Sequence, residues 1–262
     1  MRLFIKKIFN SFIFRKVRNE LNYKPPIINI GKVKSSATLS DSFPWRTDSG
    51  FNTYFRFINN LKLFYNIDDA KVEIVFYSKK GELIKKLNIN NLTLSNELII
   101  SKDFLGVEDF GIFNVFYKLN KLDTKEPIII LEKSYIGFSK NNLCPSFVHG
   151  NIPIKGKDLL EEKIFSNFFY KSYFINKTYQ IQNNFSDSDS LELFFANPLN
   201  SRIIFYLNKE KFFLEKNSCR IVILNKNFIK NNFGFIKIKS NCSFLRPYIF
   251  NYRDKFFDCF HS

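Results

Sequence analysis

The feature that most constrains the fold is a succession of short segments rich in β-branched and aromatic residues, separated by turn signals. The segments are FNTYFRF, KVEIVFY, ELIIS, FGIFNVFY and PIIILEKSYIGF, followed further on by SLELFFA, RIIFYL, CRIVIL, FGFIKIK and RPYIFNY. Between two of them, SKKGEL (78–83) is typical of a hairpin turn, because Gly adopts the dihedral angles that such turns require. Many short strands at this spacing predict an all-β protein made of antiparallel β-sandwiches.

A second feature is that similar landmarks recur in the same order in both halves of the chain. In chain order, the pairs are LSDS (39–42) and FSDS (185–188), FRFINN and LFFANP, VEIVFY and RIIFY, FGIFNV and FGFIKI, Tyr135-Ile136 and Tyr248-Ile249, and His149 and His261. Self-similarity in a conserved order within one chain indicates an internal duplication. We therefore predict two tandem β-sandwich repeats with the same strand order.

This duplication gives the expected division of the 262 residues. Residues 1–30 form a basic N-terminal segment, 31–150 the first repeat, 151–172 a linker and 173–262 the second repeat. Within the linker, KGKDLLEEKIFSNFF has Asp158 followed by Glu161, a capping-box-like start, and apolar residues at helical spacing. We therefore expect a short linker helix there.

The N-terminal stretch MRLFIKKIFNSFIFRKVRNELNYKPP is the most concentrated basic region of the chain. Its apolar residues fall at three-to-four spacing, which predicts an amphipathic helix that ends before Pro25-Pro26. Two interpretations are open. The helix of residues 1–24 lies on an anionic membrane surface, or its apolar face docks on the body of the protein. Lys6 and Lys7 interrupt any signal-peptide core, which favours a cytoplasmic protein, peripheral on the inner face of the membrane in the first interpretation.

The net charge of +16 does not by itself indicate a nucleic-acid partner. Only nine of the 40 basic residues are Arg, and outside the N-terminus the basic residues are scattered. Nucleic-acid surfaces are usually clustered and use Arg for bidentate contacts. A solvated lysine-rich surface is the interpretation that we favour.

The segment FPWRTDSG (43–50) is the candidate ligand site. Counted between the landmarks, it is an insertion in the first repeat, and it contains the single Trp of the chain. Trp45 could stack on a sugar face while Arg46, Thr47 and Asp48 fix hydroxyl groups, as in carbohydrate or peptide recognition. The alternative is that Trp45 is a hydrophobic plug at one end of the sandwich.

The remaining conspicuous residues are Cys144, His149, Cys259 and His261. They contain the atoms of a zinc site, but Cys-x4-His and Cys-x-His match no familiar zinc spacing. We interpret them as structural, repeat-equivalent positions, and we expect no metal and no cofactor. Since no glycine-rich phosphate loop, nucleophile elbow or H-E-x-x-H motif is present, the sequence favours a non-catalytic binding or assembly module with a carbohydrate or protein partner. The alternative is an enzyme of carbohydrate or surface-polymer metabolism with its site at the Trp45 loop.

Overall fold

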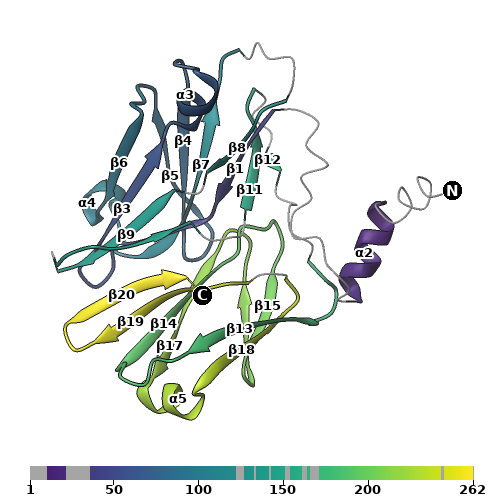
Figure 1. Ribbon diagram of the computed structural model, residues 1–262, viewed down its shortest axis with the longest axis vertical. Coiled ribbons are helices and arrows are strands. Elements are labelled where there is room, and N and C mark those ends of the chain that lie inside the picture. Colours follow the sequence, from purple (N-terminus) through teal and green to yellow (C-terminus); the bar gives the residue numbers. More distant parts are fainter. Residues whose placement is uncertain are drawn as a thin grey trace.

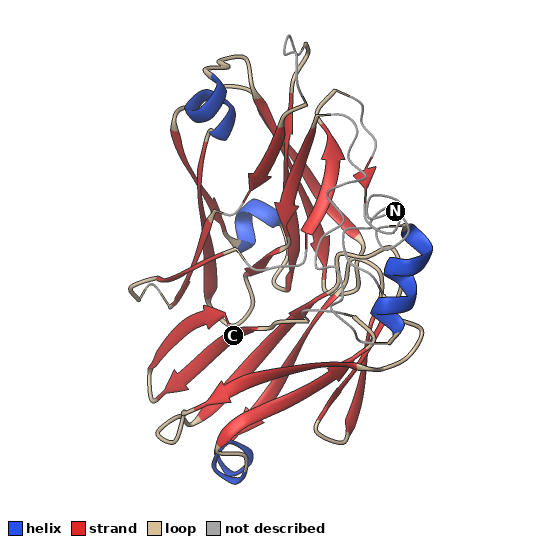
Figure 2. Cartoon of the chain, turned by 45° about the vertical axis from the view of Figure 1, so that its right-hand side comes forward, coloured by secondary structure: helices blue, strands red, loops and turns tan. Residues whose placement is uncertain are grey.

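The computed structural model describes residues 11–21, 36–121, 127–132, 134–141, 143–150, 154–160, 164–165, 171–242 and 245–261. It consists mostly of β-strands, as Figures 1 and 2 show. The helices of the described residues are α2 (Phe12–Glu20), α3 (Asn60–Tyr65), α4 (Lys102–Leu105) and α5 (Lys226–Asn231). An all-β fold was predicted, and it is confirmed.

Two groups of sheets follow one another along the chain, which we call the N-terminal unit (β1 to β12) and the C-terminal unit (β13 to β20). The N-terminal unit contains β1 (Ala37–Asp41), β2 (Phe43–Arg46), β3 (Phe51–Ile58), β4 (Lys71–Ser78), β5 (Leu83–Ile89), β6 (Ser95–Ile100), β7 (Phe110–Lys118), β8 (Ile129–Glu132), β9 (Tyr135–Lys140), β10 (Ser146–His149), β11 (Ile154–Asp158) and β12 (Ile164–Phe165). The C-terminal unit contains β13 (Lys177–Asn183), β14 (Ser190–Ala196), β15 (Ile203–Leu207), β16 (Glu210–Leu214), β17 (Cys219–Asn225), β18 (Gly234–Ser240), β19 (Tyr248–Arg253) and β20 (Phe256–His261).

The strand order of two sheets in the N-terminal unit recurs in the C-terminal unit. The orders β2-β7-β4-β5 and β10-β9-β3-β6 correspond to β13-β18-β15-β16 and β20-β19-β14-β17. FGIFNV lies in β7 and most of FGFIKI in β18, so these two landmarks occupy corresponding strands. The N-terminal unit has a further sheet, β12-β11-β1-β8, in which β1 and β8 are parallel, whereas the other paired strands of the described residues are antiparallel.

One landmark pair does not correspond in the structure. LSDS (39–42) lies in and just after β1, ahead of β2, whereas FSDS (185–188) follows β13. β2 and β13 hold corresponding places in their sheets, so LSDS and FSDS are not equivalent positions. The number of residues that follows each of them therefore does not identify FPWRTDSG as an insertion. The segment is β2 followed by a turn, rather than an added loop.

The predicted linker helix is wrong for the described part of residues 151–172. Ile154–Asp158 forms β11, which pairs along β1 from Ala37↔Asp158 to Asp41↔Ile154, and Ile164–Phe165 forms β12. Pairing with β1 satisfies the backbone of this segment, and tertiary pairing of this kind overrides local helix signals.

Gly81 illustrates how the predicted β4–β5 hairpin is built. It adopts φ +88°, and its N–H donates to the carbonyl of Ser78 at 2.9 Å. A Cβ atom at this position would lie 2.1 Å from the backbone oxygen of Lys216 in the C-terminal unit. The glycine is therefore required both by the turn and by the close approach of the other unit.

The hydrophobic core of the described residues forms two clusters, and each of them contains residues of both units. Leu191, Leu193 and Phe195 on one face of β14 pack within the C-terminal unit. Phe194, on the opposite face, belongs to the cluster that fills the N-terminal unit, and so does Phe250 of β19. The central strands β14 and β19 of the sheet β17-β14-β19-β20 are thus covered on both faces along much of their length, which explains their consecutive apolar residues. The outer strands β17 and β20 keep exposed positions.

Helix α2 covers part of the predicted N-terminal helix, while residues 1–10 and 22–35 lie outside the described residues. In Figures 1 and 2, α2 stands at the side of the molecule, separate from the sheets. Among the described residues, no helix has the length and apolar character needed to cross a membrane.

Candidate functional site

Trp45 lies in the core with no exposed surface. Its indole Nε1–H donates to the carbonyl of Tyr77 at 3.0 Å, on β4, two strands away from β2. The ring passes over Gly111, where an added Cβ would lie 2.6 Å from the indole. This is the placement expected for the hydrophobic plug, and neither face of the ring is open to a ligand.

Arg46 lies beside Trp45 and is also buried, at 2% exposure. Its guanidinium binds both carboxylate oxygens of Asp48, with distances of 2.9 and 2.7 Å, and forms an ion pair with Glu192 of the C-terminal unit. It also stacks on Phe51, 4.0 Å from the ring centroid. Burial disfavours the guanidinium charge, but Asp48 and Glu192 outweigh it and raise the pKa of Arg46.

Thr47 completes this group of predicted residues. Its Oγ1 donates to the carbonyl of Val107 at 2.7 Å and accepts from the N–H of Asp109 at 3.2 Å. The four residues 45–48 therefore serve internal contacts: Trp45 fills the core, Arg46 and Asp48 join the units, and Thr47 holds the turn after β2.

The two histidines of the chain meet where β10 and β20 lie side by side. Their Nε2 atoms are 2.6 Å apart. Arg246 Nη2 lies 3.1 Å from His261 Nδ1, and His149 Nδ1 lies 3.0 Å from the carbonyl of Gly150. The assignment that satisfies all three contacts is Arg246 donating to His261, His261 donating to His149, and His149 donating to Gly150, with both imidazoles neutral.

This contact does not have the geometry of a shared metal. Two nitrogens bound to one tetrahedral zinc at about 2.0–2.1 Å would be roughly 3.3 Å apart. Of the two cysteines in the predicted group, Cys144 is exposed and Cys259 is buried. Among the described residues, no cluster of three or more His, Cys, Asp or Glu side chains could hold a metal ion.

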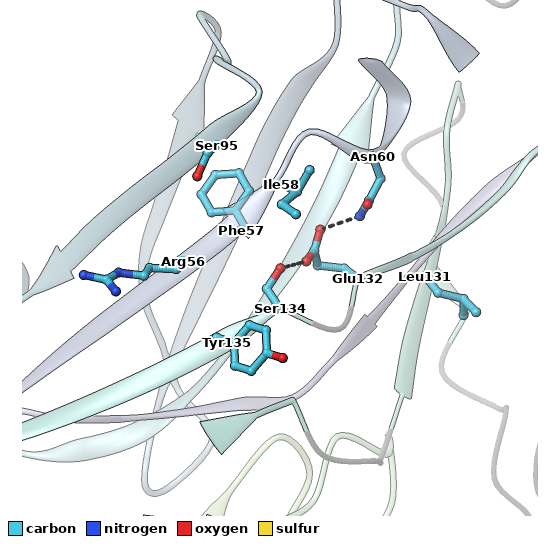
Figure 3. Close-up of a pocket in the computed structure, with 9 residues that line it drawn as sticks. All are labelled: Arg56, Phe57, Ile58, Asn60, Ser95, Leu131, Glu132, Ser134 and Tyr135. Carbon is cyan, nitrogen blue, oxygen red and sulfur yellow. Dashed lines mark hydrogen bonds between the residues drawn. The ribbon is translucent and has the colours of Figure 1, made fainter. Parts of the chain in front are cut away.

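A pocket of about 350 Å³ opens elsewhere on the N-terminal unit, around the buried Glu132 (Figure 3). We call it the Glu132 pocket. Its lining residues are Arg56, Phe57, Ile58, Asn60, Ser95, Leu131, Glu132, Ser134 and Tyr135. They come from β3, the start of α3, β6, β8, β9 and the connection between β8 and β9, so the pocket is assembled from segments distant in sequence.

Glu132 lies behind the polar groups of the pocket and has no exposed surface. Ser134 Oγ donates to one carboxylate oxygen, and Asn60 Nδ2 lies 3.4 Å from the other. Burial raises the pKa of Glu132 to about 7, although hydrogen bonds from Ser134, Tyr117 and Asn60 act in the opposite direction. The carboxyl group is therefore poised to change its protonation state near neutral pH.

The rim of the Glu132 pocket is exposed. Tyr135 is 59% exposed, and the apolar residues Ile58 and Leu131 are 46% and 44% exposed. Arg56 borders the pocket and pairs with Glu97 on the surface. The pocket thus combines an exposed aromatic ring with the polar groups of Asn60 and Ser134.

From the sequence, Glu132 is predicted only as part of the strand-like segment PIIILEKSYIGF. The sequence pattern did indicate that Glu132 points inward. Side chains alternate along a strand, so Glu132 lies on the same side of β8 as the buried Ile130. A carboxylate in an inward position of an apolar strand marks a candidate site. Its partners Asn60 and Ser134 carry no comparable signal.

A second buried titratable group lies at the boundary of the units. Lys155 of β11 is 2% exposed and donates to Asn217 Oδ1 of the C-terminal unit at 2.8 Å. Burial, with a smaller contribution from Lys216, lowers the pKa of Lys155 to about 8.

Comparison with known proteins does not assign this chain to a family. The sequence matches no family model and no curated protein. A solved structure with some similarity is described as a cupin 2 conserved barrel domain protein from Leptotrichia buccalis, 10% identical over 79% of this chain and 78% of that chain. Its TM-score of 0.16 is too low for this likeness to support a conclusion about fold or function.

Proposed function

We propose that this protein is a non-catalytic binding module that takes a carbohydrate in the Glu132 pocket. The observation that carries the proposal is the exposed ring of Tyr135 near Ser134, in a pocket that Asn60 lines on the other side of Glu132. An aromatic ring can stack on the apolar face of a sugar, and convergent polar groups can bind its hydroxyls. The Glu132 pocket thereby replaces the Trp45 segment as the candidate site.

Glu132 acts in this proposal as a positioning residue. It has no exposed surface, so it holds Ser134 and Asn60 through hydrogen bonds rather than contacting the ligand. Side chains fixed in advance lose less conformational entropy when a ligand binds. This gives the buried carboxylate a role that does not require a reaction.

The enzymatic alternative has less support at this pocket. A carboxyl group with a pKa of about 7 could act as a general acid. Most glycosidases, however, require a second carboxylate across the scissile bond. Among the lining residues of the Glu132 pocket, Glu132 is the only carboxylate, so binding is the function that we favour.

Titration with an oligosaccharide panel tests the proposal. An array of neutral and acidic oligosaccharides identifies a ligand, and calorimetry then compares wild type with Tyr135→Ala. Loss of a stacking anchor costs about 1–3 kcal/mol, so we expect binding to weaken by about 5- to 150-fold. Phe256→Ala is the matched control, because Phe256 is an exposed aromatic residue of β20, at 69%; this variant should bind like wild type.

Two results would contradict the proposal. One is the absence of binding to every oligosaccharide of the panel. The other is equal affinity of Tyr135→Ala and wild type for a sugar that does bind, which would place the site elsewhere.

We also infer that the two units arose by internal duplication. The support is the recurring strand order, together with the FGIFNV and FGFIKI landmarks in corresponding strands. The division of the chain at 31–150 and 173–262 remains part of this proposal. An experimental structure in which the eight corresponding strands fail to superpose would contradict it.

A further inference from the structure

Helix α2 and the residue that follows it carry an exposed apolar stripe. Ile13, Val17 and Leu21 are spaced four residues apart and are 73%, 47% and 73% exposed. Residues at this spacing lie on one side of a helix. An amphipathic helix normally buries its apolar side against the core, whereas these three side chains remain exposed.

Two polar side chains of α2 that border the stripe, Lys16 and Glu20, contact the body of the protein. The carboxylate of Glu20 accepts from the backbone N–H of Tyr173 at 3.0 and 3.1 Å. Lys16 Nζ lies 3.3 Å from Tyr173 Oη and 4.9 Å from the ring centroid. Among the described residues, Lys16 and Glu20 attach the helix to the body, while Ile13, Val17 and Leu21 remain exposed.

Aromatic residues extend the exposed surface beside the attachment point. Tyr173 and Phe174 are 76% and 68% exposed, and Phe14 of the helix is 37% exposed. We define the α2 patch as these three residues together with Ile13, Val17 and Leu21. Exposed apolar residues gathered in this way mark an interaction site.

The charge of the surrounding sequence indicates which partner the α2 patch meets. Residues 1–24 contain seven Lys or Arg residues and a single acidic residue, Glu20. Apolar and aromatic residues on a helix with Lys and Arg nearby are the combination that binds at the interface of an anionic bilayer. A protein partner would explain the apolar residues but would not by itself call for this excess of positive charge.

We propose that the α2 patch inserts into the headgroup region of an anionic membrane and holds the protein at that surface. The proposal does not depend on the Glu132 pocket, which lies on the N-terminal unit. The apolar stripe would supply the burial, and the basic residues would supply attraction to anionic lipids.

Sedimentation with vesicles tests the proposal on the full chain. Wild type should sediment with phosphatidylcholine vesicles that contain phosphatidylserine, and should stay in the supernatant with phosphatidylcholine alone. The double variant Ile13→Ser/Leu21→Ser should partition at least about tenfold less, because it removes two large apolar side chains from the interface. The matched control is Ile223→Ser/Phe235→Ser, which changes two exposed apolar residues of the C-terminal unit and should partition like wild type.

Circular dichroism of both double variants checks that they remain folded. The proposal is overturned if the α2 double variant sediments as wild type does, or if wild type stays in the supernatant with both vesicle types. A dimer of wild type that the α2 double variant abolishes, measured by light scattering without lipid, would instead identify a second copy of the chain as the occupant and would also overturn it.

Discussion

Arg46 keeps its charge in a buried position because acceptors surround it. Asp48 comes from the same turn and Glu192 from the other unit, where Tyr252 also binds Glu192 at 2.9 Å. The side chains of Asp48 and Glu192 are only 22% and 17% exposed. Removing Arg46 would therefore leave two poorly solvated carboxylates without their cation.

We expect Arg46→Ala to lower the free energy of unfolding by roughly 3–5 kcal/mol, the usual cost of breaking a buried ion pair. Arg56→Ala is the control, since the Arg56–Glu97 pair is exposed and such pairs contribute about 1 kcal/mol or less. Urea melts of both variants measure the difference. Equal losses in the two variants would mean that the Arg46 cluster contributes no more than a surface pair.

Trp45→Ala should destabilise the protein by roughly 3–5 kcal/mol, because it empties a large part of the core and removes the bond to Tyr77. A urea melt followed by circular dichroism measures this loss. Tyr135→Ala should cost far less, since Tyr135 is largely exposed. A change below about 1 kcal/mol for Trp45→Ala would be incompatible with a core position.

Glu132 should make stability depend on pH. Its pKa is raised from 4.5 to about 7, so between these values the folded protein keeps a proton that the unfolded chain has lost. Stability due to Glu132 therefore falls as the pH rises from about 4.5 to 7, by about 3 kcal/mol at about 1.36 kcal/mol per pH unit.

Glu132→Gln removes this titration while preserving the shape of the side chain. Urea melts at pH 5 and pH 8 should show that wild type loses more stability than the variant over this interval. If wild type and Glu132→Gln lose the same amount, Glu132 does not titrate in this range.

At the scale of elements, α2 and β11 differ in the contacts that join them to the rest of the protein. β11 is paired along β1 and carries Lys155, which reaches the C-terminal unit. α2 contacts the body through surface hydrogen bonds around Tyr173. Removal of the two elements should therefore have different consequences for folding.

Deletion of residues 1–24 should leave the melting temperature nearly unchanged, since exposed polar contacts contribute little to stability. Differential scanning calorimetry of the full chain and of residues 25–262 makes the comparison. A loss of several kcal/mol would show that the apolar face of the N-terminal segment is part of the core.

At the scale of the whole molecule, the two units are joined by aromatic packing. Phe250 of the C-terminal unit lies 4.9 Å from Phe138 and 5.9 Å from Phe51 of the N-terminal unit, measured between ring centroids. Phe110 and Phe194 make a further contact at 5.9 Å. A core that runs through both units predicts that they unfold together.

Trp45 is the single Trp of the chain, so its fluorescence reports unfolding of the N-terminal unit, whereas far-ultraviolet circular dichroism reports both units. In wild type, the two transitions should coincide in urea. Phe250→Ala should shift both to lower urea, at a cost of roughly 3–5 kcal/mol. A variant in which only the circular dichroism transition moves would show that the units unfold independently.

The sequence by itself determined the local features of this protein. Segments rich in β-branched and aromatic residues, such as KVEIVFY, predicted strands, and Gly81 predicted a hairpin. The spacing of Phe9, Phe12 and Ile13 predicted an N-terminal helix, of which Phe12–Glu20 is described. These features depend on the residue and its close neighbours in sequence, which is why they could be predicted.

Tertiary structure alone decided which residues meet across long distances in the sequence. Asp158, which was predicted to begin a helix, is the last residue of a strand that pairs with β1. Trp45 lies in the core, and Glu132 lies beside Asn60. The physical reason is that pairing and burial are contributed by partners tens of residues away, and their free energies exceed the small local preferences that a sequence pattern records.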